Sequence, residues 1–491
     1  PPPPPPPPPP NRPHAQPTGM QARAAAAVLV TCAVPTGRAS SPCAGLRFHV
    51  HALPAIPVSR VTGKTGGHSS CGLPILPWML EHRCRTNQSE CLDNRTAAVP
   101  PYFGKRVTVA RAPPAASASL FRTHQFTLDQ FFYRHIATHC RAASAASADA
   151  FLVPYPAGDV LLAQQYAPLL SRHPHPQIGY QDRLMRLLEA TPQWRRSGGL
   201  DHLLVLSRIT RDFLLPCTKK PRRCTNRGYD KWRARLNNSF SAVHPFWKDT
   251  NVFTIEATIS NAWRFPLPGG LRAVPYPTFL HPASHAELEG WSDFVRVKSR
   301  PKLQSLACGA RGNRRSIIKM CMESPVCSYL ETPNTGSYVD IIESDVYRDT
   351  IQLYLESTYC LQPPGDSPSR RGIFDALVSG CIPVVFGEDS VQYPDYFGVG
   401  NLAVVSVPNR AALRRHLAGI GDAEIDKRRA AVVKLIPRLV YGRLGHDSGG
   451  FGVAFRAMRD RIIARRGKSA AAGARFVLGA VTPNATEGNE K

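Results

Sequence analysis

The chain has 491 residues, about two or three times the length of an ordinary domain, so we expect two packed cores and some sequence that does not pack. Hydrophobic residues make up 43% and charged residues 20% of the chain, which excludes wholesale disorder. Lys and Arg number 61 against 35 Asp and Glu, and the net charge of +26 favours anionic partners: nucleic acid, acidic lipid, acidic polysaccharide or phosphorylated small molecules.

The basic residues are spread along the whole chain in short groups, such as Arg195-Arg196, Arg314-Arg315 and Arg414-Arg415. A solvated basic surface accounts for this distribution better than a nucleic-acid groove does. The sequence also has no helix-turn-helix signature, zinc-finger spacing or RNP-type aromatic run, so we expect no nucleic-acid partner.

The 13 cysteines are too few for a disulfide scaffold, and the sequence has no Cys-x-x-Cys pair of the kind found in zinc modules. Several cysteines lie in local groups, which fits local pairing in an oxidising compartment: Cys71, Cys84 and Cys91; Cys217 and Cys224; Cys308, Cys321 and Cys327. Four Asn-x-Ser/Thr sequons are compatible with a luminal or secreted chain, and they begin at Asn87, Asn94, Asn237 and Asn484.

Residues 1–100 are predicted to be a Pro-rich leader that begins with a polyproline tract. If translation began at Met20, Arg23 followed by the apolar run Ala24–Val34 would be typical of a secretory signal. That run is shorter than the ~20 residues needed to span a bilayer, so membrane association would require a missing or atypical N-terminal anchor. The stretch 35–101, rich in Pro, Gly, Ser and Cys, is interpreted as a stem or small disulfide-stapled insert, or alternatively as a disordered linker.

Regular structure is predicted from about residue 102 onward, as helices and strands in alternation. Helical spacing occurs over Thr127–Ala143, Gln181–Ala190, Ala423–Leu435 and Phe451–Arg465. Apolar strand patterns occur over Ala150–Pro154, Leu203–Leu206, Val252–Ile255 and Ala403–Val407. The alternation is typical of parallel sheets covered by helices on both faces, and the length predicts two such α/β domains facing one another.

The strongest chemical signal is a strand, loop, helix and strand that together span residues 359–386. The loop 363–371 leaves the carboxyl edge of a parallel sheet, where open α/β sheets bind ligands. The small residues of Gly365-Asp366-Ser367 let the backbone approach a ligand, and Ser367 and Ser369 could cap the helix that follows. The free amides of the first helical turn attract anions, so we expect a diphosphate there.

Three charged residues complete this predicted nucleotide-sugar site. Arg370 and Arg371 add positive charge at the helix start, and Asp375 lies one turn later, able to accept from sugar or ribose hydroxyls. The alternative is a simple turn followed by a solvated helix start. The combination with Asp375 and with the strand entry Gly380-x-x-Pro383 favours the site.

The segment from Leu361 to Val385 resembles the signature of exostosin-type glycosyltransferases (GT47), nearest the plant xyloglucan galactosyltransferase branch. Three further blocks are similar to the family in the same order, and the resemblance covers roughly residues 101–440: Asp149–Tyr155, Gly198–Ser207 and Val274–Pro282. The resemblance implies a GT-B-like α/β fold with two Rossmann-like domains and a central cleft. The acceptor-side domain would span 101–272, the nucleotide-sugar domain 273–440, and a C-terminal helix and tail 441–491.

The resemblance also implies a Golgi-resident enzyme that inverts the anomeric configuration of a sugar taken from a UDP-sugar, most simply UDP-galactose. The acceptor would be a polysaccharide or glycoprotein glycan. No metal or other cofactor is expected, and the sequence has no Asp-x-Asp motif. Without a metal, the arginines and helix amides must stabilise the departing diphosphate.

An inverting transfer needs a general base on the acceptor side. Asp201 and His202 are the predicted catalytic residues, because Gly198-Gly199 would deliver them to the mouth of the following strand. The alternative is a histidine satisfied by the backbone, and Asp159 is the reserve candidate. Leu200 replaces the arginine usual in the family, which puts acceptor or phosphate contacts there in doubt.

Other aromatic and cysteine residues have two interpretations each. Tyr276, Phe279 and His281 could orient a sugar or nucleobase, or only pack in a rigid loop. Cys321 and Cys327 are predicted to form a disulfide, Cys360 and Cys381 to pack as thiols, and Trp263 and Trp291 to be core or domain-interface residues. The second hypothesis for the whole chain is a non-catalytic glycan-binding relative of the same fold, supported by Leu200, and a basic nucleic-acid or membrane-surface binder ranks below it.

Overall fold

In a computed structural model of the chain, the structure describes residues 41–52, 106–155, 180–213, 245–257, 268–312, 314–332, 345–365, 369–387, 393–397, 402–443 and 449–478. Several predictions therefore fall outside the described residues. They concern the polyproline tract, the signal after Met20, the four sequons, the cysteine groups at 71–91 and 217–224, and the residues Asp159, Trp263, Asp366 and Ser367.

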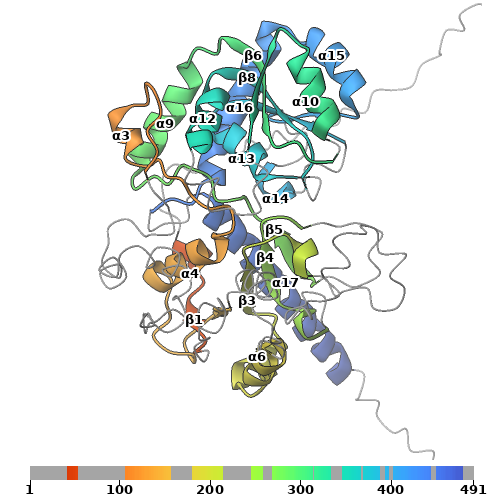
Figure 1. The fold of residues 1–491 in the computed structure, drawn as a ribbon. Coiled ribbons are helices and arrows are strands. Elements are labelled where there is room, and N and C mark those ends of the chain that lie inside the picture. The colour runs from red at the N-terminus through yellow and green to blue at the C-terminus, as the bar shows by residue number, and fades with distance from the viewer. Residues whose placement is uncertain are drawn as a thin grey trace, which may run out of the picture. The chain divides into compact units, whose positions relative to one another are not determined.

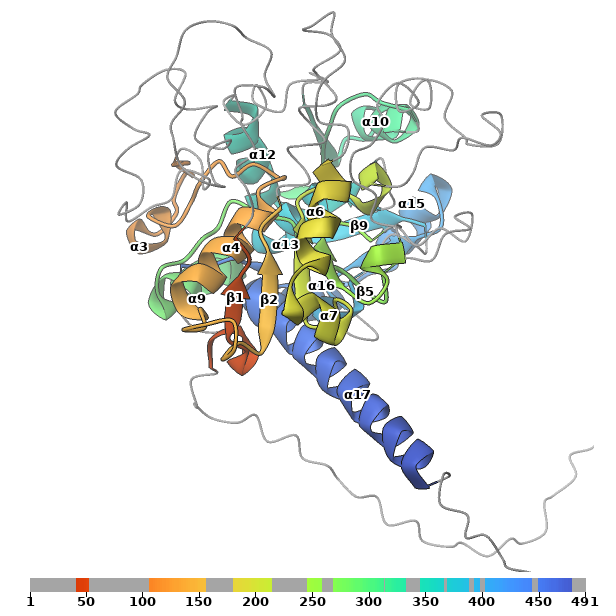
Figure 2. The same cartoon turned by 90° about the horizontal axis from the view of Figure 1, so that it is seen from below.

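The first sheet has five parallel strands in sequential order, β1-β2-β3-β4-β5. They span Phe48–Val50, Ala150–Val153, His202–Leu206, Asn251–Thr254 and Gly270–Ala273. Alternate residues of β3 enter two different cores: Leu203 and Val205 pack with α4, whereas Leu204 and Leu206 pack with α6 and α7. Figure 2 shows α4 beside β1 and β2, with α6 and α7 on the opposite side.

The second sheet is also parallel and has the order β10-β9-β8-β6-β7. Its strands are β6 (Lys302–Cys308), β7 (Cys327–Glu331), β8 (Ser357–Gln362), β9 (Ile382–Phe386) and β10 (Val405–Val407). Every residue of β8 is buried, and β9 is an apolar run that is buried except at its last residue, as expected for strands covered on both faces. The two sheets confirm the predicted α/β class with two Rossmann-like units.

Helices cover both sheets, and Figure 1 shows those of the second sheet around β6 and β8. Those of the first sheet are α4 (Leu128–His139), α6 (Tyr180–Glu189) and α7 (Pro192–Ser197). Those of the second are α9 (His285–Val297), α10 (Arg314–Met322), α12 (Asp345–Leu355), α13 (Arg371–Val378), α14 (Pro394–Phe397), α15 (Arg410–Ala418) and α16 (Asp422–Leu439). The short helices are η1 (Pro42–Gly45), α3 (Pro114–Ser117), η5 (Thr210–Phe213) and η7 (Pro245–Trp247).

The last helix, α17 (Gly450–Leu478), returns to the first sheet. Phe455 packs against Phe48 of β1 and Phe132 of α4, with ring centroids 5.6 and 5.4 Å apart. Arg461 donates to the Asn251 side chain at 3.2 Å. The C-terminal segment is therefore part of the first core. Within the described part of the chain, no helix combines the length and apolar character needed to cross a bilayer.

The interpretation of residues 35–101 as a stem or linker is wrong for Phe48–Val50. This segment is β1, which pairs with β2. A disulfide between Cys43 and Cys140 fixes it beside the end of α4, and Phe48 is fully buried. A three-residue strand flanked by Pro-rich sequence has too little periodicity to be recognised. His135 lies near the same two sulfurs, but their disulfide leaves no thiolate to bind a metal.

The second sheet contains two further disulfides. Cys321–Cys327 is confirmed, whereas the prediction that Cys360 and Cys381 remain thiols is wrong, since they are bonded to each other. Cys360 lies in β8 and Cys381 directly precedes the neighbouring β9, so register brings together residues that the sequence separates by α13. The bond ties the two strands on either side of the loop at 363–370. Cys308 is the free cysteine of the described residues.

Candidate active site

The strand order of the second sheet identifies its ligand-binding edge. When the strands are numbered in chain order within this sheet, their spatial order is 2-1-3-4-5, which is a doubly wound arrangement. Successive strands are added on one side of β6 and then on the other, so the switch point lies between β6 and β8. Ligands of such sheets bind at the carboxyl ends of the strands on either side of this switch point. Here the loop after β6 leads to Arg314 at the start of α10, and the loop after β8 leads to Arg370 and α13.

Arg370 lies across the switch point. Its Nη2 donates to the carbonyl oxygen of Ala307 in β6 at 3.1 Å, and its Nη1 is buried without a hydrogen-bond partner in the described part of the chain. Arg314 approaches from the other side, where its Nε donates to the Pro364 carbonyl at 3.0 Å. Burial raises the pKa of the nearby Cys308 thiol, although the charges of both arginines act to lower it. Two guanidinium groups therefore converge on one sheet edge.

The start of α13 has no side-chain cap among the described residues. Its N-cap is Arg370, in an extended conformation with φ −164° and ψ 160°. Gly372 is required in the first turn, because a Cβ there would lie 2.4 Å from Gln362 Oε1. That oxygen is buried and has no partner among the described residues. First-turn amides, an unpartnered guanidinium nitrogen and an unpartnered amide oxygen therefore lie together, and nucleotide phosphates and hydroxyls have the chemistry to satisfy them.

The structure corrects the predicted orientation of Arg371 and Asp375. Arg371 Nε donates to Asp375 Oδ2 at 2.9 Å, Nη1 donates to the Thr123 carbonyl at 2.6 Å, and Nη2 donates to the Tyr347 hydroxyl. Burial alone would lower the pKa of Arg371, but Asp375 and Tyr347 raise it above its ordinary value. The i,i+4 pairing was predictable, but the inward direction was not. Arg371 fixes the segment before α4 to α13, and only Asp375 Oδ1 lacks a partner within this described cluster.

Ser369 also differs from the expectation. It does not cap α13; its buried hydroxyl lies 3.3 Å from the Tyr393 hydroxyl, which donates to the carbonyl oxygen of Ile255 just after β4 at 2.6 Å. The loop at α13 is thereby connected to the carboxyl edge of the first sheet. Gly365 packs near the Ser369 carbonyl, which a Cβ would approach to 3.3 Å.

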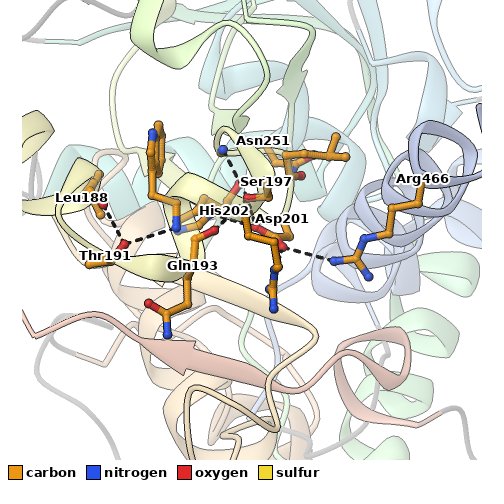
Figure 3. Close-up of polar contacts among 12 residues, drawn as sticks. Leu188, Thr191, Gln193, Ser197, Asp201, His202, Asn251 and Arg466 are labelled. Atoms are coloured by element: carbon orange, nitrogen blue, oxygen red, sulfur yellow. Dashed lines mark hydrogen bonds and ion pairs between the residues drawn. The ribbon is translucent and has the colours of Figure 1, made fainter. Parts of the chain in front are cut away.

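Asp201 and His202 form a buried polar cluster at the opposite, amino end of the first sheet. Asp201 Oδ1 accepts from the Ser197 hydroxyl at 2.6 Å and lies 2.9 Å from His202 Nδ1. Its Oδ2 accepts from Arg196 at 3.2 Å and from Arg466 of α17 at 3.1 Å. Figure 3 shows Ser197, His202 and Arg466 converging on this carboxylate from α7, β3 and α17.

The expectation that the glycines bring these two side chains to an accessible mouth of β3 is wrong. Both side chains are 0% exposed, and His202 packs against the rings of Phe151 and His51, with ring centroids 5.0 and 5.1 Å away. Burial would raise the pKa of Asp201, but its hydrogen bonds to His202 and Ser197 lower it below the ordinary value, and burial lowers that of His202. Asp201 is thus ionised beside a neutral imidazole. The contacts of this pair are those of a structural anchor.

The aromatic loop after β5 packs in the core. Phe279 and His281 are fully buried, and His281 bonds the Tyr441 carbonyl through Nδ1 at 2.8 Å and the Thr123 hydroxyl through Nε2 at 2.7 Å. Tyr276 donates to Glu256 Oε1 at 2.7 Å, and both residues are buried. Trp291 is likewise buried, as predicted, and donates to the Val378 carbonyl. The packing interpretation of this loop is therefore the one the contacts support.

Buried neutral histidines predict acid sensitivity of the fold. Burial lowers the pKa of His51 and His281 to about 3, well below the unfolded value near 6.5. Their contribution to stability is therefore complete above pH 6.5 and is lost as the pH falls from there towards 3. We expect each of these two histidines to lower the free energy of unfolding by about 2 kcal/mol at pH 5 relative to pH 7. The urea midpoint of unfolding, measured at both pH values, reports this loss. His416→Gln at an exposed site should leave that pH dependence unchanged, and a midpoint that does not move between the two pH values would contradict this expectation.

Sequence reasoning missed Arg314 and Gln362, which lie at the same edge as Arg370. Arg314 was visible as a basic residue at the start of a helix, but the preceding strand gave no clear signal. Gln362 is the last residue of the strand before the predicted loop. Its contact with Gly372 becomes apparent only in the structure, where a Cβ on Gly372 would collide with the Gln362 side chain.

Comparison with known proteins identifies the family of the chain. The model of the exostosin GT47 domain matches residues 76–416. The chain belongs to the exostosin GT47 family of glycosyltransferases. The match begins before residue 101, where the sequence resemblance was placed, and ends before 440.

Named GT47-family relatives come from Arabidopsis thaliana. Probable xyloglucan galactosyltransferase GT19 is 31% identical over 378 residues, which are 71% of this chain and 80% of the relative. Probable xyloglucan galactosyltransferase GT13 is 30% identical, covering 73% and 76%. Xyloglucan galactosyltransferase MUR3 is 29% identical, covering 70% of this chain but only 54% of the relative. Among solved structures, a chain of the GtfA/B complex aligns with 10% identity and a TM-score of 0.27, over 58% of this chain and 60% of that one.

Proposed function

We propose that this GT47 glycosyltransferase moves a sugar, most simply galactose, from a UDP-sugar to a polysaccharide or glycoprotein glycan with inversion at the anomeric carbon. The observation that carries the proposal is a group of polar atoms at the start of α13 that have no partner among the described residues: the uncapped helix start, Arg370 Nη1 and Gln362 Oε1. Relatives named as xyloglucan galactosyltransferases support the sugar and the acceptor class.

In the proposed reaction, the diphosphate lies between Arg370 and Arg314 at the switch point. The acceptor hydroxyl attacks the anomeric carbon, the bond to the diphosphate oxygen breaks, and the nucleoside diphosphate leaves with its added negative charge. Fixed guanidinium groups and helix amides stabilise that charge without rearranging, which is how a preorganised site lowers the barrier. We infer that these groups take the place of a metal ion.

The proposed location is the Golgi lumen or membrane, within the secretory pathway. Three disulfides in the described residues support an oxidising compartment. The alternative of a non-catalytic glycan-binding relative depended on Leu200, but this residue lies in the turn at the amino end of β3, where its carbonyl accepts from Asn251. Its side chain is far along the strand from the carboxyl edge, so the substitution gives no reason to expect loss of turnover.

A donor and acceptor screen tests the proposal. The purified chain is incubated with UDP-sugars and xyloglucan oligosaccharides, with and without EDTA, and product linkage is read by NMR. We expect transfer from at least one UDP-sugar with inverted configuration, and a rate that EDTA leaves within twofold. Glycan binding without turnover for any donor would contradict the proposal, and activity that EDTA abolishes would contradict the metal-free chemistry.

A further inference from the structure

We propose that Asp129, in the first turn of α4, is the general base that takes the proton from the acceptor hydroxyl. This inference rests on the proposed transfer reaction and assigns a residue to its proton transfer. Asp129 lies at the carboxyl edge of the first sheet, because its amide donates to the hydroxyl of Ser207, the residue that follows β3, at 3.0 Å.

Two independent sets of contacts place Asp129 beside the donor loop. In the first, Leu206 and Thr254 are register partners on adjacent strands, so the residues that follow them, Ser207 and Ile255, are neighbours about 5 Å apart. The Ile255 carbonyl is bonded to Tyr393, whose hydroxyl lies 3.3 Å from that of Ser369 in the donor loop. The path from Asp129 to Ser369 is thus on the order of 20 Å or less.

The second set begins at α13. Arg371 Nη1 donates to the Thr123 carbonyl at 2.6 Å, and Asp129 is only six positions after Thr123. A chain of that length spans at most about 20 Å when fully extended. Because both ends of this segment are fixed, one to α13 and one to β3, Asp129 lies within reach of a sugar whose diphosphate is at the start of α13.

The state of the carboxyl group also suits a base. Asp129 is half-buried, and its Oδ1 accepts from the Gln130 amide at 2.9 Å. Burial raises the pKa of Asp129 to about 7, although the Ser207 hydroxyl and backbone amides act to lower it. A pKa near the working pH allows the group to be ionised and still bind a proton well.

The other carboxylates close to this path are less suitable. Glu256 follows β4 at the same edge, but it is buried and accepts from Tyr276. Asp201 is at the amino edge and carries two arginines. In the step itself, the hydroxyl proton moves to Asp129 as the oxygen bonds to the anomeric carbon and the sugar–diphosphate bond breaks.

The test compares Asp129→Asn, Asp129→Glu and Glu256→Gln with the parent chain. We expect Asp129→Asn to lower kcat/KM for transfer by about 10²- to 10⁴-fold while the Kd for UDP stays within threefold. Asp129→Glu should recover part of the rate, because it keeps a carboxylate. Thermal unfolding serves as the control: at neutral pH, well above the ordinary pKa of an aspartate, the raised pKa of Asp129 means that its carboxylate costs stability, so the amide should not lower Tm.

The pH profile gives a readout that a structural role would not move. Parent kcat/KM should fall as the pH is lowered through about 7, because protonated Asp129 cannot act as a base. The charged and titratable groups on the adjoining segments are Arg208, which covers the Phe126 ring, and His124, which accepts from the Phe126 amide. His124→Gln should therefore keep the acid limb, and its loss in that variant would overturn the assignment.

Two results would overturn the inference without affecting the proposed function: transfer by Asp129→Asn within tenfold of the parent, or an equally large loss confined to Glu256→Gln with unchanged Tm. If the parent itself transfers no sugar from any UDP donor, it is the proposed function that fails.

Discussion

Replacing Arg370 with alanine is expected to raise the Kd for UDP by about 10- to 100-fold, which corresponds to the loss of one or two charge-assisted hydrogen bonds. Its Nη1 is buried and unpartnered among the described residues, so it is poised to donate to a phosphate oxygen. Its Nη2 is already held by the Ala307 carbonyl, which fixes the guanidinium before the ligand arrives. Isothermal titration with UDP measures the change.

The matched control is Arg315→Ala, which removes the same charge from an exposed position in α10. We expect it to change the Kd for UDP by less than twofold. Arg371→Ala serves as a second comparison, because that guanidinium binds Asp375, Thr123 and Tyr347 and should instead lower stability. Unchanged UDP affinity in folded Arg370→Ala would show that the phosphates are held elsewhere.

Replacing Asp201 with alanine is expected to lower the free energy of unfolding by about 3 kcal/mol. The substitution leaves the buried His202 Nδ1 and Ser197 hydroxyl without their acceptor and separates α17 from the amino end of β3. For a chain of this size, the loss corresponds to a fall in Tm of about 3–4 °C.

Two companion variants separate the components of the Asp201 effect. Asp201→Asn keeps an acceptor for Ser197 and His202 and should cost about half as much. Arg466→Ala removes a half-exposed partner and should cost less than about 1 kcal/mol. All three should keep kcat/KM for transfer within threefold at 25 °C. A large fall in kcat/KM of Asp201→Asn with unchanged Tm would restore the catalytic role that the sequence predicted for this pair.

Sequence patterns were sufficient for elements that are long or strongly apolar. The helices Leu128–His139 and Tyr180–Glu189 and the strand His202–Leu206 lie within a few residues of their predicted bounds. The loop that leads into α13 was also identified, because glycine, serine and arginine directly after a strand of an α/β sheet are typical of a phosphate-binding loop. The short β1 was missed because three residues carry almost no periodicity.

Side-chain directions were the part that the sequence could not supply. The spacing of Arg371 and Asp375 predicts their contact but not that the pair faces the core. Asp201 and His202 lie where a strand begins, which in a parallel sheet is the amino edge, away from the ligand-binding side. Only the structure shows that both side chains are buried there. Asp129 was overlooked because a single acid in the first turn of a helix is ordinary, and its position follows from Ser207, 78 residues further along the chain.

A crystal structure of the chain soaked with UDP tests the central claim most directly. The account predicts that both phosphates lie at the start of α13, within hydrogen-bond distance of Arg370 Nη1 and a first-turn amide, with the ribose towards Gln362. Density for the nucleotide at the amino edge beside Asp201, or anywhere away from the β6–β8 switch point, would contradict it.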